Sequence, residues 1–114
     1  MEEKNLDALL IEASKNGKKD KVIKLLDSGA NIHAESDLAL IVAAGSGQND
    51  VVIELLNREA DIHSDDDFAL KLAAENGYEN VVKELLARGA NPNARKDEIL
   101  KNTLIYGNVE IYQL

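Results

Sequence analysis

A chain of 114 residues, of which 45% are apolar, is long enough to bury one core and too short for two ordinary domains. Cysteine is absent, which excludes disulfides and cysteine metal ligands, and the net charge of −8 disfavours a nucleic-acid partner. The acidic N-terminus lacks an apolar signal segment, and no apolar run approaches the roughly 18 residues of a membrane span. We therefore expect an intracellular, cytoplasmic protein without membrane contact.

The chain repeats itself every 30 residues. Residues 35–64 align without a gap with residues 65–94, residues 5–34 carry the same pattern, and residues 95–114 repeat its first two thirds. Such self-similarity is the signature of stacked structural units that each contact only their neighbours. The sequence predicts a single domain over 1–114, built from three full repeats and a partial fourth.

Each repeat is predicted to form two short helices. In the second repeat, Asp37 is placed to cap the N-terminus of a helix that ends near Gly45. Gly47 then breaks the helix, and Asp50 is placed to cap the next one. The apolar stripes of the two helices are formed by Leu40, Ala43 and Ala44 and by Val51, Val52, Leu55 and Leu56. Because one such pair cannot bury its own stripe, the pairs must stack into an all-α solenoid.

The second helix of each repeat should end in a left-handed residue. Gly29 and Gly89 stand at this place in the first and third repeats, and glycine suits a left-handed backbone. Glu59 takes the same place in the second repeat, which predicts a poorer C-cap there.

The residue pattern of the repeats resembles the ankyrin repeat. The resemblance is carried by LAAENGYENVVKELLARGANPNA at 72–94 and by VAAGSGQNDVVIELLNREADIHS at 42–64. It implies a helix–turn–helix solenoid that recognises proteins without catalysis. Partners of such domains usually dock on the finger tips and on the concave face of the first helices.

Two departures from the common ankyrin pattern concern the fingers. The period is 30 residues instead of the usual 33, and LALI at 38–41 and FALK at 68–71 replace the usual Thr-Pro-Leu-His. Both departures resemble the short-fingered ankyrin repeats abundant in giant DNA viruses. The resemblance therefore implies shortened β-turn fingers and, for a viral protein, location in the host cytoplasm.

Three consecutive aspartates at 65–67 are compatible with a metal site, an acid–base pair or an exposed turn. Only the third position, held by Asp37 and Asp67, stays acidic in every repeat, whereas the first two change even in charge sign. We interpret the constant aspartate as a helix cap and the variable pair as solvent-exposed turn residues. A calcium site would need further oxygen ligands, which a segment leading straight into a helix does not offer.

His33 and His63 share one place in successive repeats. A zinc site would need about four ligands close together, and the third repeat offers only Asn93 at this place. We interpret both histidines as turn residues bonded to the neighbouring backbone. No metal ion or cofactor is expected.

The only basic cluster, KNGKKDKVIK at 15–24, is interpreted as the solvated end of the first repeat, and contact with an acidic partner or RNA is the alternative. Glycines occur singly at helix breaks, and no serine has a histidine or acid at a spacing typical of a nucleophile. The sequence therefore identifies no catalytic residue, and an enzyme has no positive support.

The function predicted is a non-catalytic module that binds a protein with a basic patch. The second and third repeats carry net charges of −5 and −3, and much of this acid lies in the turns. The partner-binding residues are predicted from their variation between repeats: Glu35, Ser36, Gly45, Ser46, Asp65, Asp66, Glu75, Asn76, Arg95 and Lys96. The alternative is a structural segment of a longer solenoid, or a self-associating scaffold, without a partner of its own.

The two ends of the repeat array differ in polarity. Glu12 and Lys21 stand where the inner repeats have apolar residues, so the N-terminal repeat is predicted to be a polar cap. The C-terminal unit instead carries Ile105, Tyr106 and Tyr112, which predicts either a homodimer through this unit or a piece of a longer array. A monomer with a frayed last unit is the alternative.

Overall fold

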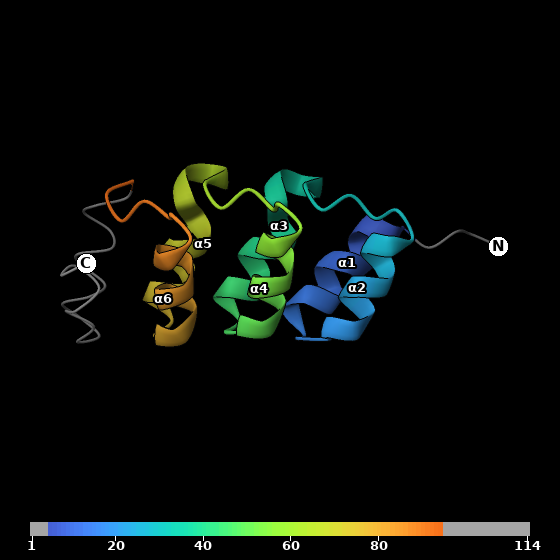
Figure 1. Ribbon diagram of the computed structural model, residues 1–114, viewed down its shortest axis with the longest axis horizontal. Helices are drawn as coiled ribbons and strands as arrows, with labels where there is room; N and C mark the ends of the chain where they lie inside the picture. Colours follow the sequence, from blue (N-terminus) through green and yellow to red (C-terminus); the bar gives the residue numbers. More distant parts are fainter. Residues whose placement is uncertain (1–4, 95–114) are drawn as a thin grey trace.

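The computed structural model of the chain describes residues 5–94. Six helices lie in this part, arranged as three pairs side by side along the longest dimension of the molecule (Figure 1). They are α1 (Leu6–Lys15), α2 (Lys19–Asp27), α3 (Ala34–Gly45), α4 (Asn49–Asn57), α5 (Ser64–Glu75) and α6 (Glu79–Ala87). The described residues contain no strand, so the predicted all-α helix–turn–helix solenoid is confirmed. Within residues 5–94, every helix is too short or too polar to cross a bilayer.

The helices form two layers. The first helices of the pairs, α1, α3 and α5, pack on one another, and the second helices, α2, α4 and α6, form the other layer. Neighbouring helices pack more extensively in the first layer than in the second. We therefore expect the first layer to form the concave side of the stack.

Small side chains inside the first layer allow this close packing. Ala43 and Ala73 are completely buried, and their neighbours Ala44 and Ala74 are at most 2% exposed. The larger core side chains come from the predicted stripes and include Leu40, Leu55, Leu70, Leu85, Val51, Val52, Val81 and Val82. Full burial of one such side chain contributes about 1.5–3 kcal/mol, so the stacking of pairs is the main source of stability.

The starts of α3 and α5 differ from the prediction. Both helices begin three residues before the constant aspartate, and the turns over residues 35–37 and 65–67 have left-handed backbone angles, with φ between 55° and 60°. The right-handed part of each helix follows the aspartate, as predicted. A left-handed turn costs about 1–2 kcal/mol per residue outside glycine, which makes these two turns the most strained segments described.

The ends of the second helices follow the prediction. Gly29 and Gly89 have φ values of 107° and 101°, and Glu59 adopts the same left-handed region at 73°. The backbone N–H of the residue after each of them donates to the carbonyl five residues earlier, as when Ala60 N donates to Leu55 O at 3.0 Å. Glu59 therefore keeps the hydrogen bonds of the glycine cap while adopting a backbone that a side chain disfavours.

Candidate protein-binding surface

The constant aspartate joins one repeat to the next instead of capping its own helix. Among the described residues, the carboxylates of Asp37 and Asp67 bond only a histidine ring and a backbone N–H of the following link, and neither accepts an amide of its own helix. Each aspartate instead accepts the backbone N–H of the residue 24 positions downstream: Asp7 from Asn31 at 2.7 Å, Asp37 from Asp61 at 2.8 Å and Asp67 from Asn91 at 2.8 Å. The predicted cap role is therefore wrong, because the carboxylate lies at the contact between repeats.

Asp50 is not a cap either. The helix α4 begins at Asn49, so Asp50 lies inside its first turn, and the residue before the helix, Gln48, makes no side-chain cap bond. A carboxylate in this turn still favours the positive end of the helix. A true side-chain cap occurs at α1, where Asn5 accepts the N–H groups of Asp7 and Ala8 at 2.9 and 3.2 Å.

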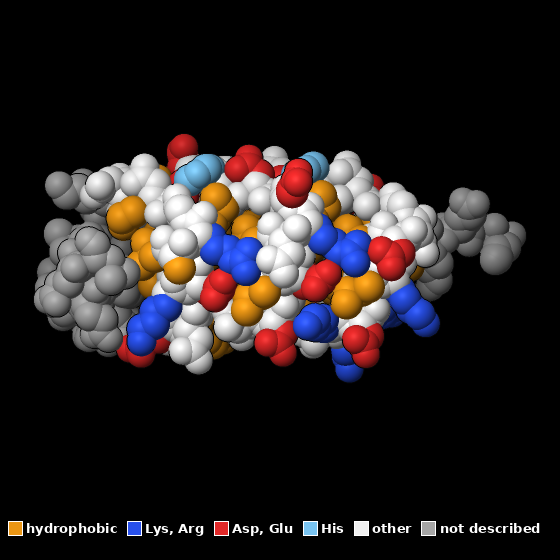
Figure 2. Space-filling model, in the orientation of Figure 1, with side chains coloured by type: hydrophobic (Ala, Val, Ile, Leu, Met, Phe, Trp, Pro, Cys, Tyr) orange, Lys and Arg blue, Asp and Glu red, His pale blue; other side chains and the backbone are white. Residues whose placement is uncertain are grey.

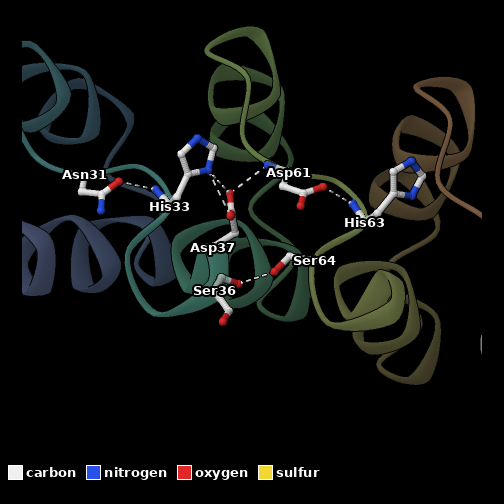
Figure 3. Close-up of polar contacts among 7 residues, drawn as sticks. All are labelled: Asn31, His33, Ser36, Asp37, Asp61, His63 and Ser64. Atoms are coloured by element: carbon white, nitrogen blue, oxygen red, sulfur yellow. Dashed lines mark hydrogen bonds and ion pairs between the residues drawn. The ribbon is translucent and has the colours of Figure 1, made fainter.

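The histidines complete the links between repeats. The Nδ1 atom of His33 lies 3.1 Å from both carboxylate oxygens of Asp37 (Figure 3). His63 contacts Asp67 in the same way, at 3.1 and 3.2 Å. The backbone N–H of His33 donates to Asn31 Oδ1 at 2.9 Å. The histidines are thus turn residues as predicted, but their rings bond a buried carboxylate and not the backbone. Residues 5–94 contain no group of three or more acidic or histidine side chains that could hold a metal ion.

Glu35, Ser36, Asp65 and Asp66 form an edge of the molecule, which we call the turn edge. All four are exposed, and they occupy the left-handed turns where α3 and α5 begin. In Figure 2, acidic side chains and histidines lie along the edge at which Figure 1 places the starts of these helices. The two turns are linked directly, because Ser64 Oγ donates to the Ser36 carbonyl at 2.7 Å (Figure 3). The turn edge is therefore an acidic strip held in a fixed geometry.

A hollow of about 540 Å³ adjoins the turn edge between the first two repeats. Its lining combines the acidic groups of Asp7 and Glu35 with the apolar side chains of Ala8, Ile11 and Leu38. Ile11 and Leu38 are only partly buried. This arrangement offers a partner both charge and apolar contact at one place, which is typical of ligand and protein sites.

A family model described as ankyrin repeats in three copies matches residues 10–96. The chain belongs to the ankyrin repeat family. No curated protein matches the sequence. Ankyrin repeats are generally protein–protein interaction modules and are generally non-catalytic.

The other predicted binding residues lie at the far ends of the first helices of these ankyrin repeats. Gly45 and Ser46 are partly buried, and Asn76 Nδ2 donates to the Gly45 carbonyl at 2.7 Å. Glu75 pairs with Lys71 at 3.1 Å. The structure therefore separates this group from the turn edge by the length of a helix. Arg95, Lys96, Ile105, Tyr106 and Tyr112 lie outside the described residues.

Sequence reasoning missed two features of the surface. Half-buried apolar side chains, among them Leu38, Phe68 and Leu72, lie along the first layer. The sequence signal for them was that apolar residues occupy equivalent positions in successive repeats. The second layer instead carries a ladder of charge pairs. Arg58 donates to Glu54 at 2.8 Å and to Asp27 of the preceding repeat at 2.9 Å.

The same ladder continues in the third repeat. Arg88 donates to Glu84 at 2.6 Å and to Asn57 at 2.8 Å, and basic and acidic side chains meet between the pairs on the face drawn in Figure 2. The hydrogen bond to Glu54, followed by that to Asp27, raises the pKa of Arg58 above its ordinary value. These arginines are engaged within the molecule and each contacts a side chain of the preceding repeat.

Proposed function

We propose that this ankyrin domain binds a protein partner with a basic patch, and that the turn edge and the adjoining hollow form the binding surface. The observation that carries the proposal is the exposed acidic strip of Glu35, Asp65 and Asp66 beside the partly apolar hollow. The second and third repeats, which supply these acids, carry −5 and −3, which together equal the net charge of −8. Acidic side chains on a fixed edge would steer a basic partner toward the concave face.

The left-handed turns support the same assignment. Strained backbone that the surrounding structure holds in place is concentrated at functional sites in proteins. Here the strain lies in the turns that present the acidic side chains, and both turns repeat it with nearly the same angles. We also assign the repeats to the short-fingered subtype resembling those of giant DNA viruses, because a three-residue turn takes the place of a full finger.

The test compares two triple variants of the chain. Glu35→Gln, Asp65→Asn and Asp66→Asn remove three charges from the turn edge, whereas Asp20→Asn, Asp50→Asn and Glu79→Gln remove three exposed charges from the first turns of the second helices. Partners captured by the unaltered chain are purified, and their affinity for each variant is measured by isothermal titration calorimetry at several salt concentrations.

The turn-edge variant should lose affinity and most of its dependence on salt, because exposed charges act through a field that salt screens. The control variant should bind like the unaltered chain. Equal affinity of both variants for every purified partner would place the binding surface elsewhere. The alternative function, a segment of a self-associating scaffold, predicts instead that the unaltered chain captures only copies of itself, and sedimentation velocity measures this directly.

A further inference from the structure

The face of the first repeat that no other described repeat covers differs from the equivalent places in the inner repeats. Val51 and Val81 are at most 1% exposed because a preceding repeat covers them, whereas Lys21, at the equivalent place, is exposed. Glu12 is likewise exposed where the inner repeats have partly buried apolar residues. The predicted polar end is confirmed for these two positions. A hollow of about 450 Å³ lies there between α1 and α2.

Lysines dominate this end of the molecule. Lys18, Lys19 and Lys21 line the hollow together with Asn16, and Lys15 and Lys24 lie nearby in the sequence. All five lysines are exposed. We call the three lysines that line the hollow the lysine face.

The lysines of the first repeat are unpaired within the described part of the chain. None of the five forms an ion pair or donates a side-chain hydrogen bond to another residue of 5–94, and Asp20 and Glu12 are the acids that line the hollow. Most cations of the next two repeats are paired. Arg58 and Arg88, the C-cap residues of α4 and α6, contact Glu54 and Glu84 of those helices, and Lys71 contacts Glu75 within α5. The first repeat thus carries five lysines against four acids, a net charge of +1, while the second and third repeats are net negative.

The position of these lysines is also unfavourable for the fold. Lys18 precedes α2, Lys19 is its first residue, and Lys21 lies in its first turn, where the helix dipole is positive. The second repeat has Gln48 and Asn49 at the first two places. A polar end would be equally soluble with neutral or acidic residues here. The lysines therefore lower the stability of their own helix, and an anionic partner would reverse that effect.

We propose that the lysine face is a docking site for an acidic protein segment, separate from the basic partner proposed for the turn edge. A hollow of this size holds a few residues of an extended chain. The net charge of −8 opposes an extended polyanion such as RNA, which would also run past the acidic second and third repeats. No aromatic side chain lines the hollow to stack on bases, and lysine lacks the planar fork with which arginine grips phosphate. A short segment rich in aspartate or glutamate contacts the lysine face alone.

The experiment measures binding of a fluorescein-labelled octaglutamate peptide to the full chain by fluorescence anisotropy, with octauridylate RNA as a second probe. The test variant carries Lys18→Gln, Lys19→Gln and Lys21→Gln. The control variant carries Asn57→Asp, Asn80→Asp and Lys83→Gln, which lower the net charge by the same amount at exposed places of the second and third repeats. Loss of three exposed charge contacts predicts a fall in affinity of roughly tenfold for the test variant. The control variant should keep the affinity of the unaltered chain within about twofold, because charges at a distance are screened.

Thermal unfolding separates docking from folding. The test variant should melt no lower than the unaltered chain, since its lysines oppose the dipole of α2. Several results would overturn the proposal: no binding of the peptide at millimolar concentration, equal losses in both variants, or RNA binding at least as tightly as the peptide. A dimer of the unaltered chain that the test variant abolishes would also overturn it, by making a second copy the occupant.

Discussion

Replacing Asp37 with alanine should lower the free energy of unfolding by about 2–3 kcal/mol. Asp37 is 4% exposed, and its carboxylate accepts the backbone N–H of Asp61 at 2.8 Å. A hydrogen bond to a charged group contributes about 1.5–3 kcal/mol, and its loss leaves the amide without that partner. The contact with His33 is half exposed and adds at most about 0.5 kcal/mol.

Two further variants at this position distinguish the inter-repeat bond from a helix cap. Serine caps a helix about as well as aspartate but is too short to reach the next repeat, so Asp37→Ser should be nearly as destabilising as Asp37→Ala. Asparagine keeps an acceptor oxygen and tolerates the left-handed backbone, so Asp37→Asn should cost only about 1 kcal/mol. Urea denaturation followed by circular dichroism gives these differences.

Hydrogen exchange adds a readout that is specific to the contact. The amide of Asp61 should exchange faster in Asp37→Ala, while amides in the first turn of α3 should change less. The reasoning would be refuted if Asp37→Ser restored the stability of the unaltered chain, since a local cap would then explain the constant aspartate.

Four other substitutions test the fold by the same urea denaturation. Glu59→Gly should stabilise the domain by about 1 kcal/mol because φ is 73°. Gly89→Glu should destabilise it by a similar amount because φ is 101°, and no clash adds to this cost since open space surrounds the Cβ position. The two changes in stability must have opposite signs. Ala73→Leu should cost about 1–3 kcal/mol by overpacking a completely buried place, and a neutral result would mean that the first layer packs loosely. Ser14→Ala should be neutral or stabilising by about 1 kcal/mol, because the Ser14 hydroxyl is buried without a hydrogen-bond partner; a clear loss of stability would reveal a partner.

The amino-acid sequence by itself determined the repeat, the helix pairs and the core. The 30-residue period aligns Leu40 with Leu70 and Ala43 with Ala73, and all four are buried as the apolar spacing predicts. The exposed turns were also predicted, because variation in charge sign between equivalent places is typical of solvent-facing residues. These features depend on local periodicity, which is written in consecutive residues.

Only the tertiary structure decided what the polar residues of the turns bind. A helix cap and a bond to the next repeat place the same residue type at the same position, so the pattern around Asp37 cannot separate them. The packing of the repeats separates them, because stacking brings the amide nitrogen of Asp61 within 2.8 Å of the Asp37 carboxylate. The partner of Arg58 in the preceding repeat, Asp27, depends on the same stacking. Such contacts join residues more than twenty positions apart, and their geometry is set by how the helix pairs pack, not by the residues beside them.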